Sequence, residues 1–374
     1  MQMSERLRKA PLSGIRKMFD LASSDSINLS LGEPDVLPPV EALKGMNDAA
    51  VKGMNRYGPT AGVPPLREAV ASRYSEFGVN ASNIMITPSG TTALMTIAQS
   101  ILDPGDETLI PGPGFVVYGP HTMISGGKFV EYRLTDGDFQ PDIGDIQKKI
   151  SKRTKAIFLN YPSNPTGGTL SEASFKAIRD IASDKGIIVI SDEVYEPFVY
   201  EGKHRSFITE LDNSIVVNGF SKMMAVPGWR MGFVIANGDV ITDLTKMAYH
   251  MYACPNMPAQ YGILNALPSV DGYLKGVREI YRKRRDLITS RINGIDGMSL
   301  SAPKGAFYAF PKFSYDMTSD EFAMRLVKEK LICVPGSAFG EYGEGHLRFS
   351  YAADEEKISK GMDILEKVAN NIER

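Results

Sequence analysis

Short apolar runs alternate with amphipathic segments along the chain from about residue 63 to residue 267. The runs have the length of β-strands, and the segments between them have the apolar spacing of helices. Strands that alternate with helices predict a mostly parallel sheet wrapped by helices. We predict seven strands in this sheet, at residues 83–87, 107–111, 128–133, 156–160, 187–191, 214–218 and 232–236.

The pattern changes after Leu267, where a long segment rich in Lys and Arg predicts a charged helix that reaches Ile292. Two further strands are predicted at residues 306–311 and 346–351. In the second of these, apolar positions alternate with His346, Arg348 and Ser350. Because 374 residues are too many for one ordinary core, we expect these elements to form a smaller α+β domain.

The composition is that of an ordinary globular protein, with 43% hydrophobic residues and a net charge of −2. Such a weak negative charge gives no reason to expect a nucleic-acid partner. The only two cysteines, Cys254 and Cys333, lie far apart, and the four histidines are scattered, which argues against a metal site and for a reducing compartment. Neither a signal peptide nor an apolar run of membrane-spanning length is found, so we expect a cytoplasmic protein without a membrane partner.

The first candidate for chemistry follows the apolar strand at residues 214–218, where Ser221 and Lys222 precede Arg230. A lysine at the end of a buried strand can form a Schiff base when its surroundings keep it partly neutral. An arginine and a serine beside it can hold a phosphate. This combination suggests pyridoxal phosphate, which is carried on a lysine. Taken alone, the segment also fits a solvated lysine and a structural arginine.

A second candidate is Asp192, at the carboxyl end of the strand at residues 187–191. In open α/β sheets, ligands bind outside these strand ends. A carboxylate there could pair with a protonated pyridine nitrogen, and Tyr195 could donate to the ring's phenolate oxygen if a helical turn begins here. The alternatives are a helix-capping aspartate and a packing tyrosine.

Three weaker candidates lie on other segments. The turn formed by Ser89, Gly90, Thr91 and Thr92 opens a helix, whose free N–H groups suit a phosphate, although ordinary capping looks the same. Asn164 precedes a proline after the strand at residues 156–160 and could aim its amide at a cofactor or substrate, but Asn-Pro is also a common turn. Arg348 is a bidentate donor suited to a carboxylate, or else a surface residue on an edge strand.

Together these segments resemble the class I/II aminotransferases, which belong to the fold-type-I pyridoxal-phosphate enzymes. The resemblance covers nearly the whole chain in order and is closest to the archaeal and bacterial subgroup of aspartate or aromatic aminotransferases. It rests on Leu29-Ser-Leu-Gly-Glu-Pro-Asp35, Tyr57-Gly-Pro-Thr-Ala-Gly62, Pro111-Gly-Pro-Gly-Phe115, Asn164-Pro-Thr-Gly167, Ser191-Asp-Glu-Val-Tyr195, Ser221-Lys222, Gly228-Trp-Arg230, Lys304-Gly-Ala-Phe-Tyr308 and Pro335-Gly-Ser-Ala-Phe339.

The resemblance implies a role for each of these residues. Lys222 would bind pyridoxal phosphate covalently and act as the catalytic base, and Asp192 would pair with the pyridine nitrogen. Tyr195 and Asn164 would contact the phenolate oxygen, and Phe115 would stack on the ring. The cofactor phosphate would be held by Ser89, Gly90, Thr91, Ser221 and Arg230, with Tyr57 reaching the phosphate of a neighbouring subunit. The substrate would be bound by Gly32, Phe115, Asn164 and Arg348, the last on its α-carboxylate, and Ile15, Phe19 and Tyr57 are possible pocket walls.

The resemblance also implies a large cofactor-binding domain at residues 45–267 and a small domain made of residues 1–44 and 268–374. The expected activity is ping-pong transamination by a homodimer with shared sites, between aspartate or an aromatic amino acid and 2-oxoglutarate. The alternatives are another reaction on the same scaffold, such as a β-lyase, and a non-catalytic effector-sensing domain. An NAD-dependent enzyme would need a G-x-G-x-x-G turn opening a helix, and this chain has none.

Overall fold

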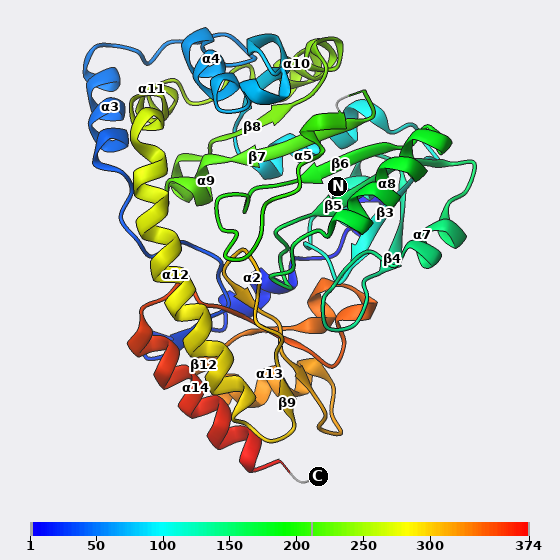
Figure 1. Cartoon of the computed structure of the whole chain (residues 1–374), viewed down its shortest axis with the longest axis vertical. Helices are drawn as coiled ribbons and strands as arrows, with labels where there is room; N and C mark the ends of the chain where they lie inside the picture. The colour runs from blue at the N-terminus through cyan, green and yellow to red at the C-terminus, as the bar shows by residue number, and fades with distance from the viewer. Residues whose placement is uncertain (1–2, 211, 373–374) are drawn as a thin grey trace.

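A seven-stranded sheet forms the upper part of the molecule in Figure 1. The computed structural model describes residues 3–210 and 212–372. The strands of this sheet are β2 (Ile84–Thr87), β3 (Glu107–Gly112), β4 (Lys128–Arg133), β5 (Thr154–Asn160), β6 (Ile188–Asp192), β7 (Ser214–Gly219) and β8 (Gly232–Ile235). Each lies within two residues of its predicted range, which confirms the strand prediction.

The strand order across this sheet is β2-β8-β7-β6-β5-β3-β4. Neighbouring strands from β7 to β4 are parallel, whereas β8 runs antiparallel to both β7 and β2. Asn160 of β5 lies beside Asp192 of β6, which lies beside Val217 of β7. The carboxyl ends of these strands therefore meet at one edge of the sheet, where ligands bind in open α/β folds. The predicted fold class, a mostly parallel sheet with a smaller α+β part, is confirmed.

Helices cover both faces of the sheet, as its continuous apolar strands require. Successive residues of β7 show this, because Ile215 and Val217 pack into one buried cluster and Val216 into the other. The helices that share the first cluster are α5 (Gly90–Ile101), α6 (Tyr118–Ile124) and α10 (Gly238–Tyr252). Those that share the second include α4 (Pro64–Ser72), α7 (Ile143–Lys149) and α8 (Glu172–Lys185).

The lower part of the molecule in Figure 1 contains short strands and longer helices. Its main sheet is antiparallel, with β14 (Leu347–Ser350) between β10 (Tyr308–Ala309) and β13 (Val334–Pro335). Two strand pairs accompany it: β1 (Ile27–Asn28) with β12 (Leu331–Ile332), and β9 (Met298–Ser299) with β11 (Lys312–Phe313). The helices are α12 (Val270–Asn293), α13 (Ser319–Lys328) and α14 (Glu355–Asn370). Because β1 pairs with β12, the N-terminal segment joins this part of the fold.

One helix belongs to both parts. Figure 1 shows α12 (yellow) running along one side of the molecule from the level of the large sheet down to α14 (red). Its length agrees with the charged helix predicted between Leu267 and Ile292.

The remaining helices are short or connect the two parts. They are α1 (Glu5–Lys9), α2 (Gly14–Phe19), α3 (Val40–Val51), α9 (Phe220–Met223) and α11 (Met257–Ala266). The 3₁₀ turns are η1 (Ser75–Phe77), η2 (Ala81–Asn83), η3 (Phe207–Glu210), η4 (Pro227–Trp229), η5 (Leu267–Ser269), η6 (Gly336–Phe339) and η7 (Glu341–Gly343).

The predicted domain boundary between residues 44 and 45 falls inside α3. This helix is continuous and packs against α11, where the Asn265 side chain donates to the Glu41 carbonyl at 2.8 Å. The division into residues 45–267 and the rest stays a prediction. No helix among the described residues is long and apolar enough to cross a membrane.

Candidate active site

A cavity of about 210 Å³ lies at the carboxyl ends of β5, β6 and β7, between the two parts of the molecule. It brings together residues that are far apart in sequence. The predicted site residues that line it are Gly32, Ser89, Gly90, Thr91, Phe115, Asn164, Asp192, Tyr195, Ser221, Lys222, Arg230 and Arg348. Of the possible pocket walls, Ile15 lines the cavity and Phe19 does not. Tyr57 lies outside it and is 90% exposed in this single chain.

Lys222 lies in α9, the short helix that follows β7. Its Nζ donates a hydrogen bond to the carbonyl oxygen of Gly32, across the cavity. Burial lowers the pKa of the Lys222 ammonium to about 8; nearby Glu33 opposes this, and Arg230 and Arg348 add to it. Since an amine with such a pKa is partly neutral near neutral pH, Lys222 can act as a nucleophile or a base.

Asp192 ends β6 with only 2% of its surface exposed. The Tyr118 hydroxyl donates to its Oδ2 at 2.8 Å, and the Val194 N–H donates to its Oδ1 at 3.4 Å. Burial raises the pKa of the Asp192 carboxyl to about 6, although both hydrogen bonds oppose the rise. A cation placed beside it would favour the ionised form. No described helix begins at Asp192, so the capping alternative is wrong.

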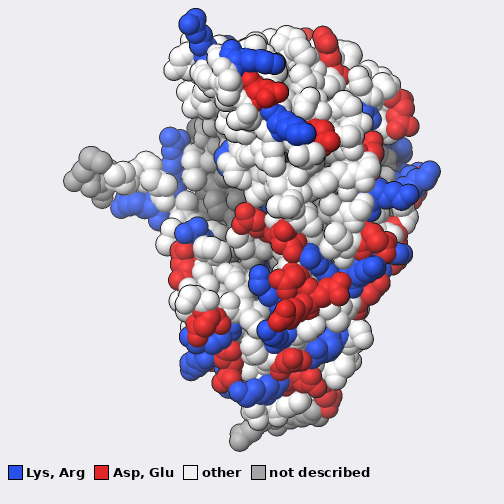
Figure 2. Space-filling model, turned by 90° about the vertical axis from the view of Figure 1, so that its left-hand side faces the viewer, with Lys and Arg blue, Asp and Glu red and all other residues white. Residues whose placement is uncertain are grey.

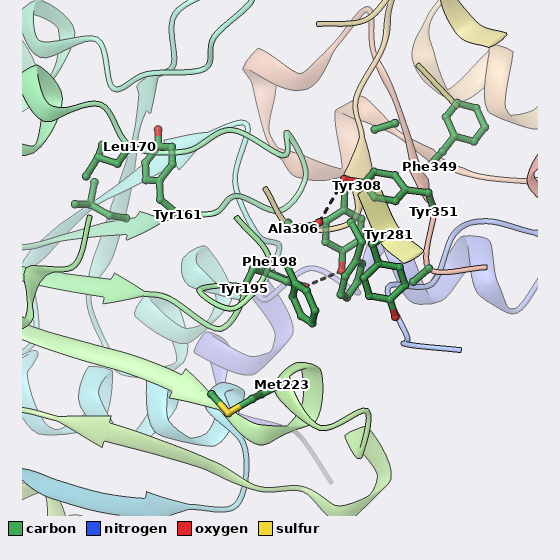
Figure 3. Packing of buried hydrophobic residues seen from close by; sticks show 14 of the residues in the cluster. Tyr161, Leu170, Tyr195, Phe198, Met223, Tyr281, Ala306, Tyr308, Phe349 and Tyr351 are labelled. Carbon is green, nitrogen blue, oxygen red and sulfur yellow. Dashed lines mark hydrogen bonds between the residues drawn. The ribbon is translucent and has the colours of Figure 1, made fainter. Parts of the chain in front are cut away.

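Tyr195 lies in the turn after β6 and meets Tyr308 of β10 from the other part of the molecule. Their hydroxyl oxygens are 2.7 Å apart, and the rings meet edge to face with centroids separated by 5.5 Å. Figure 3 shows the two rings pointing toward one another within a cluster that includes Phe198, Tyr281 and Tyr351. Burial raises the pKa of Tyr195 well above its usual value, so its hydroxyl stays protonated and can donate a hydrogen bond.

The start of α5 and the loop around Arg230 provide donors for an anion. Ser89 caps α5, and its side chain accepts a hydrogen bond from the Thr92 N–H at 3.1 Å. Ser89 and Arg230 adopt positive φ angles of 91° and 56°, a region that residues other than glycine rarely occupy. Such conformations cluster at functional sites. With the positive end of α5 beside them, these residues suit a phosphate-sized anion.

Arg348 lies on the central strand of the small sheet and is 1% exposed. The surface position on an edge strand, which the sequence left open, is therefore wrong. Its guanidinium donates to Asn164 Oδ1 at 2.9 Å and to the Ser30 carbonyl oxygen, and it stacks over the rings of Tyr308 and Phe339 at 4.7 and 5.0 Å. Its buried Nε has no hydrogen-bond partner among the described residues. A fixed, incompletely paired guanidinium suits a carboxylate ligand.

Gly32 lines the cavity at a position where Tyr308 occupies the space that a side chain would need. A Cβ atom at this position would lie 1.7 Å from the Tyr308 hydroxyl oxygen, so any side chain here would displace that tyrosine. Only glycine allows the chain to pass beneath Tyr308 and present its carbonyl to Lys222.

Three polar residues at the site had no predicted role. They are Asn160, Tyr118 and Tyr308. Asn160 lines the cavity, and its side chain donates to the Asp192 carbonyl at 2.9 Å, while Tyr118 lies behind Asp192. Tyr308 belongs to a motif of the resemblance. Tyr118 follows Phe115 by three residues at a helix start, a spacing that could have drawn attention to it.

The arrangement defines an enzyme of the α/β class whose cavity, between the two parts of the molecule, can hold an anionic ligand beside a reactive amine. The sequence model of one family, Aminotransferase class I and II, matches residues 24–365. The chain belongs to this family, and it is an aminotransferase.

Several named aminotransferases resemble the chain over almost its full length. An aspartate aminotransferase of Pyrococcus horikoshii is 39% identical, over 98% of this chain and 96% of the relative. An aromatic-amino-acid aminotransferase of Thermococcus litoralis is 37% identical, over 98% of both chains. The solved structure of an alanine aminotransferase from Pyrococcus furiosus superimposes with a TM-score of 0.93 at 35% identity, covering 99% of this chain and 100% of that one. The relatives are thus named for different amino acids.

Proposed function

We propose that the protein is a pyridoxal-phosphate-dependent aminotransferase that moves an amino group between an amino acid and a 2-oxo acid by a ping-pong mechanism. We further propose 2-oxoglutarate as the acceptor and aspartate or an aromatic amino acid as the donor. The observation that carries the proposal is the meeting of Lys222, Asp192 and Arg348 around one cavity.

The cavity residues fit the groups of this cofactor. Donors suited to its phosphate gather at the start of α5 and at Ser221 and Arg230. Lys222 is the amine that would bind its aldehyde, and Asp192 is a buried carboxylate suited to a protonated ring nitrogen. When bound, pyridoxal phosphate supplies an electron sink for the bonding electrons released at the α-carbon of the amino acid.

The residues around the cavity would then have separate roles in binding and proton transfer. Arg348 binds the α-carboxylate of the substrate and fixes its orientation, using the guanidinium that stacks on Tyr308. The neutral amine of Lys222 takes the proton from the α-carbon and later returns one. Asp192 would keep the ring nitrogen protonated, and the Tyr195 hydroxyl would donate a hydrogen bond to the ring oxygen.

The choice of donor rests on the remaining walls of the cavity. Ile15, Leu31 and Leu94 are apolar, and Thr91 offers a hydroxyl at the start of α5. The described cations that line the cavity are Lys222, Arg230 and Arg348, all of which already have roles in the proposal. These walls support a substrate with an uncharged side chain, while neutral donors can hold a second carboxylate more weakly. We therefore propose a broad enzyme rather than one restricted to aspartate.

A homodimer with shared sites is the proposed assembly. Tyr57 is 90% exposed, and apolar side chains exposed in and around α3 accompany it, namely Leu37, Val40, Leu43, Val51 and Met54. On the side of the molecule that carries α3 and α12, charged side chains crowd the lower half and uncharged surface dominates the upper half (Figure 2). An exposed apolar surface of this kind supports association. The two free cysteines support the proposed cytoplasmic location.

A half-reaction screen tests the proposed activity. The purified protein loaded with pyridoxal phosphate is mixed with aspartate, tyrosine, phenylalanine or alanine, and the visible band of the cofactor is followed while the products are identified. Bleaching with release of the matching 2-oxo acid, reversed by 2-oxoglutarate, is the expected result. Aspartate and tyrosine should differ in kcat/KM by no more than the roughly 10- to 200-fold that one pocket contact supplies. Release of ammonia with loss of the substrate side chain would instead favour a β-lyase.

A further inference from the structure

Tyr118 is a fully buried tyrosine on α6 that lies behind Asp192, outside the cavity lining. Its hydroxyl donates to Asp192 Oδ2 at 2.8 Å. Its ring stacks on Phe158 of β5, with centroids 5.0 Å apart, and the Phe115 ring meets it edge to face at 5.8 Å. Packing therefore fixes the direction in which this hydroxyl points.

The Tyr118 hydrogen bond is the shorter of the two that the Asp192 carboxylate receives from described residues. The other, from the Val194 N–H, is 3.4 Å long, and the Asn160 side chain donates to the Asp192 backbone carbonyl instead. The negative charge of the adjacent Glu193 carboxylate raises the pKa of Asp192. Glu193 itself is hydrogen-bonded to other groups. Its partners are the Ser191 hydroxyl, the Phe207 N–H and His204 Nε2. Tyr195 follows in the same turn, and its own hydroxyl pairs with Tyr308.

We propose that Tyr118 is a positioning residue that keeps the buried Asp192 carboxylate ionised and turned so that it can bind the ring nitrogen of the cofactor. Burial disfavours the ionised carboxylate, and a hydrogen bond to the charged form offsets part of that penalty. A carboxylate has about four acceptor sites, so accepting from Tyr118 leaves sites free for a ligand. The consequence for the cofactor rests on the proposed function, whereas the effect on Asp192 does not.

The chain offers a matched control in Tyr132 of β4. This tyrosine is also fully buried, and its hydroxyl donates to the Phe158 carbonyl oxygen at 2.8 Å. Tyr132→Phe therefore removes an equally buried hydrogen bond close to the same phenylalanine, but one that does not reach Asp192. Tyr118→Phe keeps the ring stacking and removes only the hydroxyl.

The first measurement is the unfolding free energy of the full chain without cofactor, from about pH 5 to about pH 8. Because the Tyr118 hydroxyl stabilises the ionised form of Asp192, the loss in Tyr118→Phe should grow as the pH rises through the pKa of this carboxyl, near 6. The loss in Tyr132→Phe should not vary with pH. Losses that are equal and independent of pH in the two variants would overturn the proposal.

The second measurement uses the loaded enzyme. Tyr118→Phe should weaken pyridoxal phosphate binding about tenfold and move the acid limb of the kcat profile up by about one pH unit, while Tyr132→Phe does neither. If the wild-type chain binds no pyridoxal phosphate, the proposed function fails while the stability measurement still decides the role of Tyr118. If the wild type is active and the two variants behave alike, the role of Tyr118 is refuted.

Discussion

The two halves of the cavity are built differently. Asp192 ends β6, and Lys222 lies in the short helix α9 directly after the neighbouring strand β7, so the pairing of these strands holds both residues at one edge of the sheet. Gly32, Tyr308 and Arg348 come from short strands and loops of the other part of the molecule. There, the orientation of Arg348 depends on side-chain contacts, including one with Asn164 at 2.9 Å.

Contacts across the cavity join these halves. Arg348 donates to Asn164, Lys222 donates to the Gly32 carbonyl, and the Tyr195 hydroxyl pairs with that of Tyr308. From this difference we expect that a substitution in the sheet half mainly lowers kcat, whereas a substitution in the other half mainly raises KM. The following variants test this division or the contacts that join the two halves.

The largest effect is expected for Lys222→Ala in the sheet half. The variant should still bind pyridoxal phosphate through the other cavity residues, but kcat should fall by several powers of ten, because the base is lost. Borohydride reduction of the loaded wild type followed by peptide mapping checks the covalent link. Label on another lysine would contradict the assignment, and Lys203→Ala on the surface serves as the control.

The next largest effect is expected for Asp192→Asn. Its kcat should fall on the order of a thousandfold while KM changes little, because charge at the ring matters most in the transition state. A near-normal kcat would leave Asp192 with a structural role only.

Asp192→Asn, which is expected to lower kcat, should in contrast raise the stability of the chain without cofactor. Burial raises the pKa of Asp192 from its usual 3.8 to about 6, so its contribution to stability is fully present below pH 3.8 and is lost as the pH rises through 6. Asp192→Asn removes this loss and should stabilise the cofactor-free chain at pH 8 by up to roughly 3 kcal/mol. Urea unfolding of both chains at pH 4 and pH 8 measures the difference, which should shrink at the lower pH.

A smaller effect, confined to binding, is expected for Arg348→Lys in the other half. The charge remains but the two-pronged contact with a carboxylate is lost, so kcat/KM should fall about a hundredfold, mainly through KM. Affinity for pyridoxal phosphate should stay within about twofold of the wild type. If kcat fell while KM did not, the proposed division between the halves would be wrong.

The smallest effect is expected for Tyr308→Phe, which breaks one contact between the halves. The ring beneath Arg348 is kept, and only the hydroxyl that pairs with Tyr195 is removed. We expect a loss of about tenfold in kcat/KM. Tyr351→Phe is the matched control, since its buried hydroxyl donates to the Ala306 carbonyl at 3.3 Å, outside the cavity lining.

The sequence predicted the sheet half more completely than the other. The apolar strands are visible as continuous runs, so the polar residues that follow them, Asp192 and Lys222, can be placed at the sheet edge from the order of the residues alone. Arg348 was chosen for its chemistry, but its burial depends on β10 and β13 lying on either side of β14, which no local pattern shows.

The contacts that were missed arise between elements distant in sequence. Tyr118 reaches Asp192 only because α6 packs on the face of the sheet shared by β5 and β6, and side-chain type does not encode that packing. The positive φ angles of Ser89 and Arg230 were also beyond prediction, since neither residue favours that region. The role of Tyr57 stays a prediction, because it concerns a second chain.

The helix α12 has a mechanical consequence. Its 24 residues form a rod about 36 Å long that starts beside the large sheet and ends beside α14 in the lower part of the molecule. A rotation of about 5° at its upper end would carry its lower end through about 3 Å, which is the length of a hydrogen bond. A helix of this length therefore turns a slight tilt at one end into a displacement at the other end that is large enough to make or break a hydrogen bond.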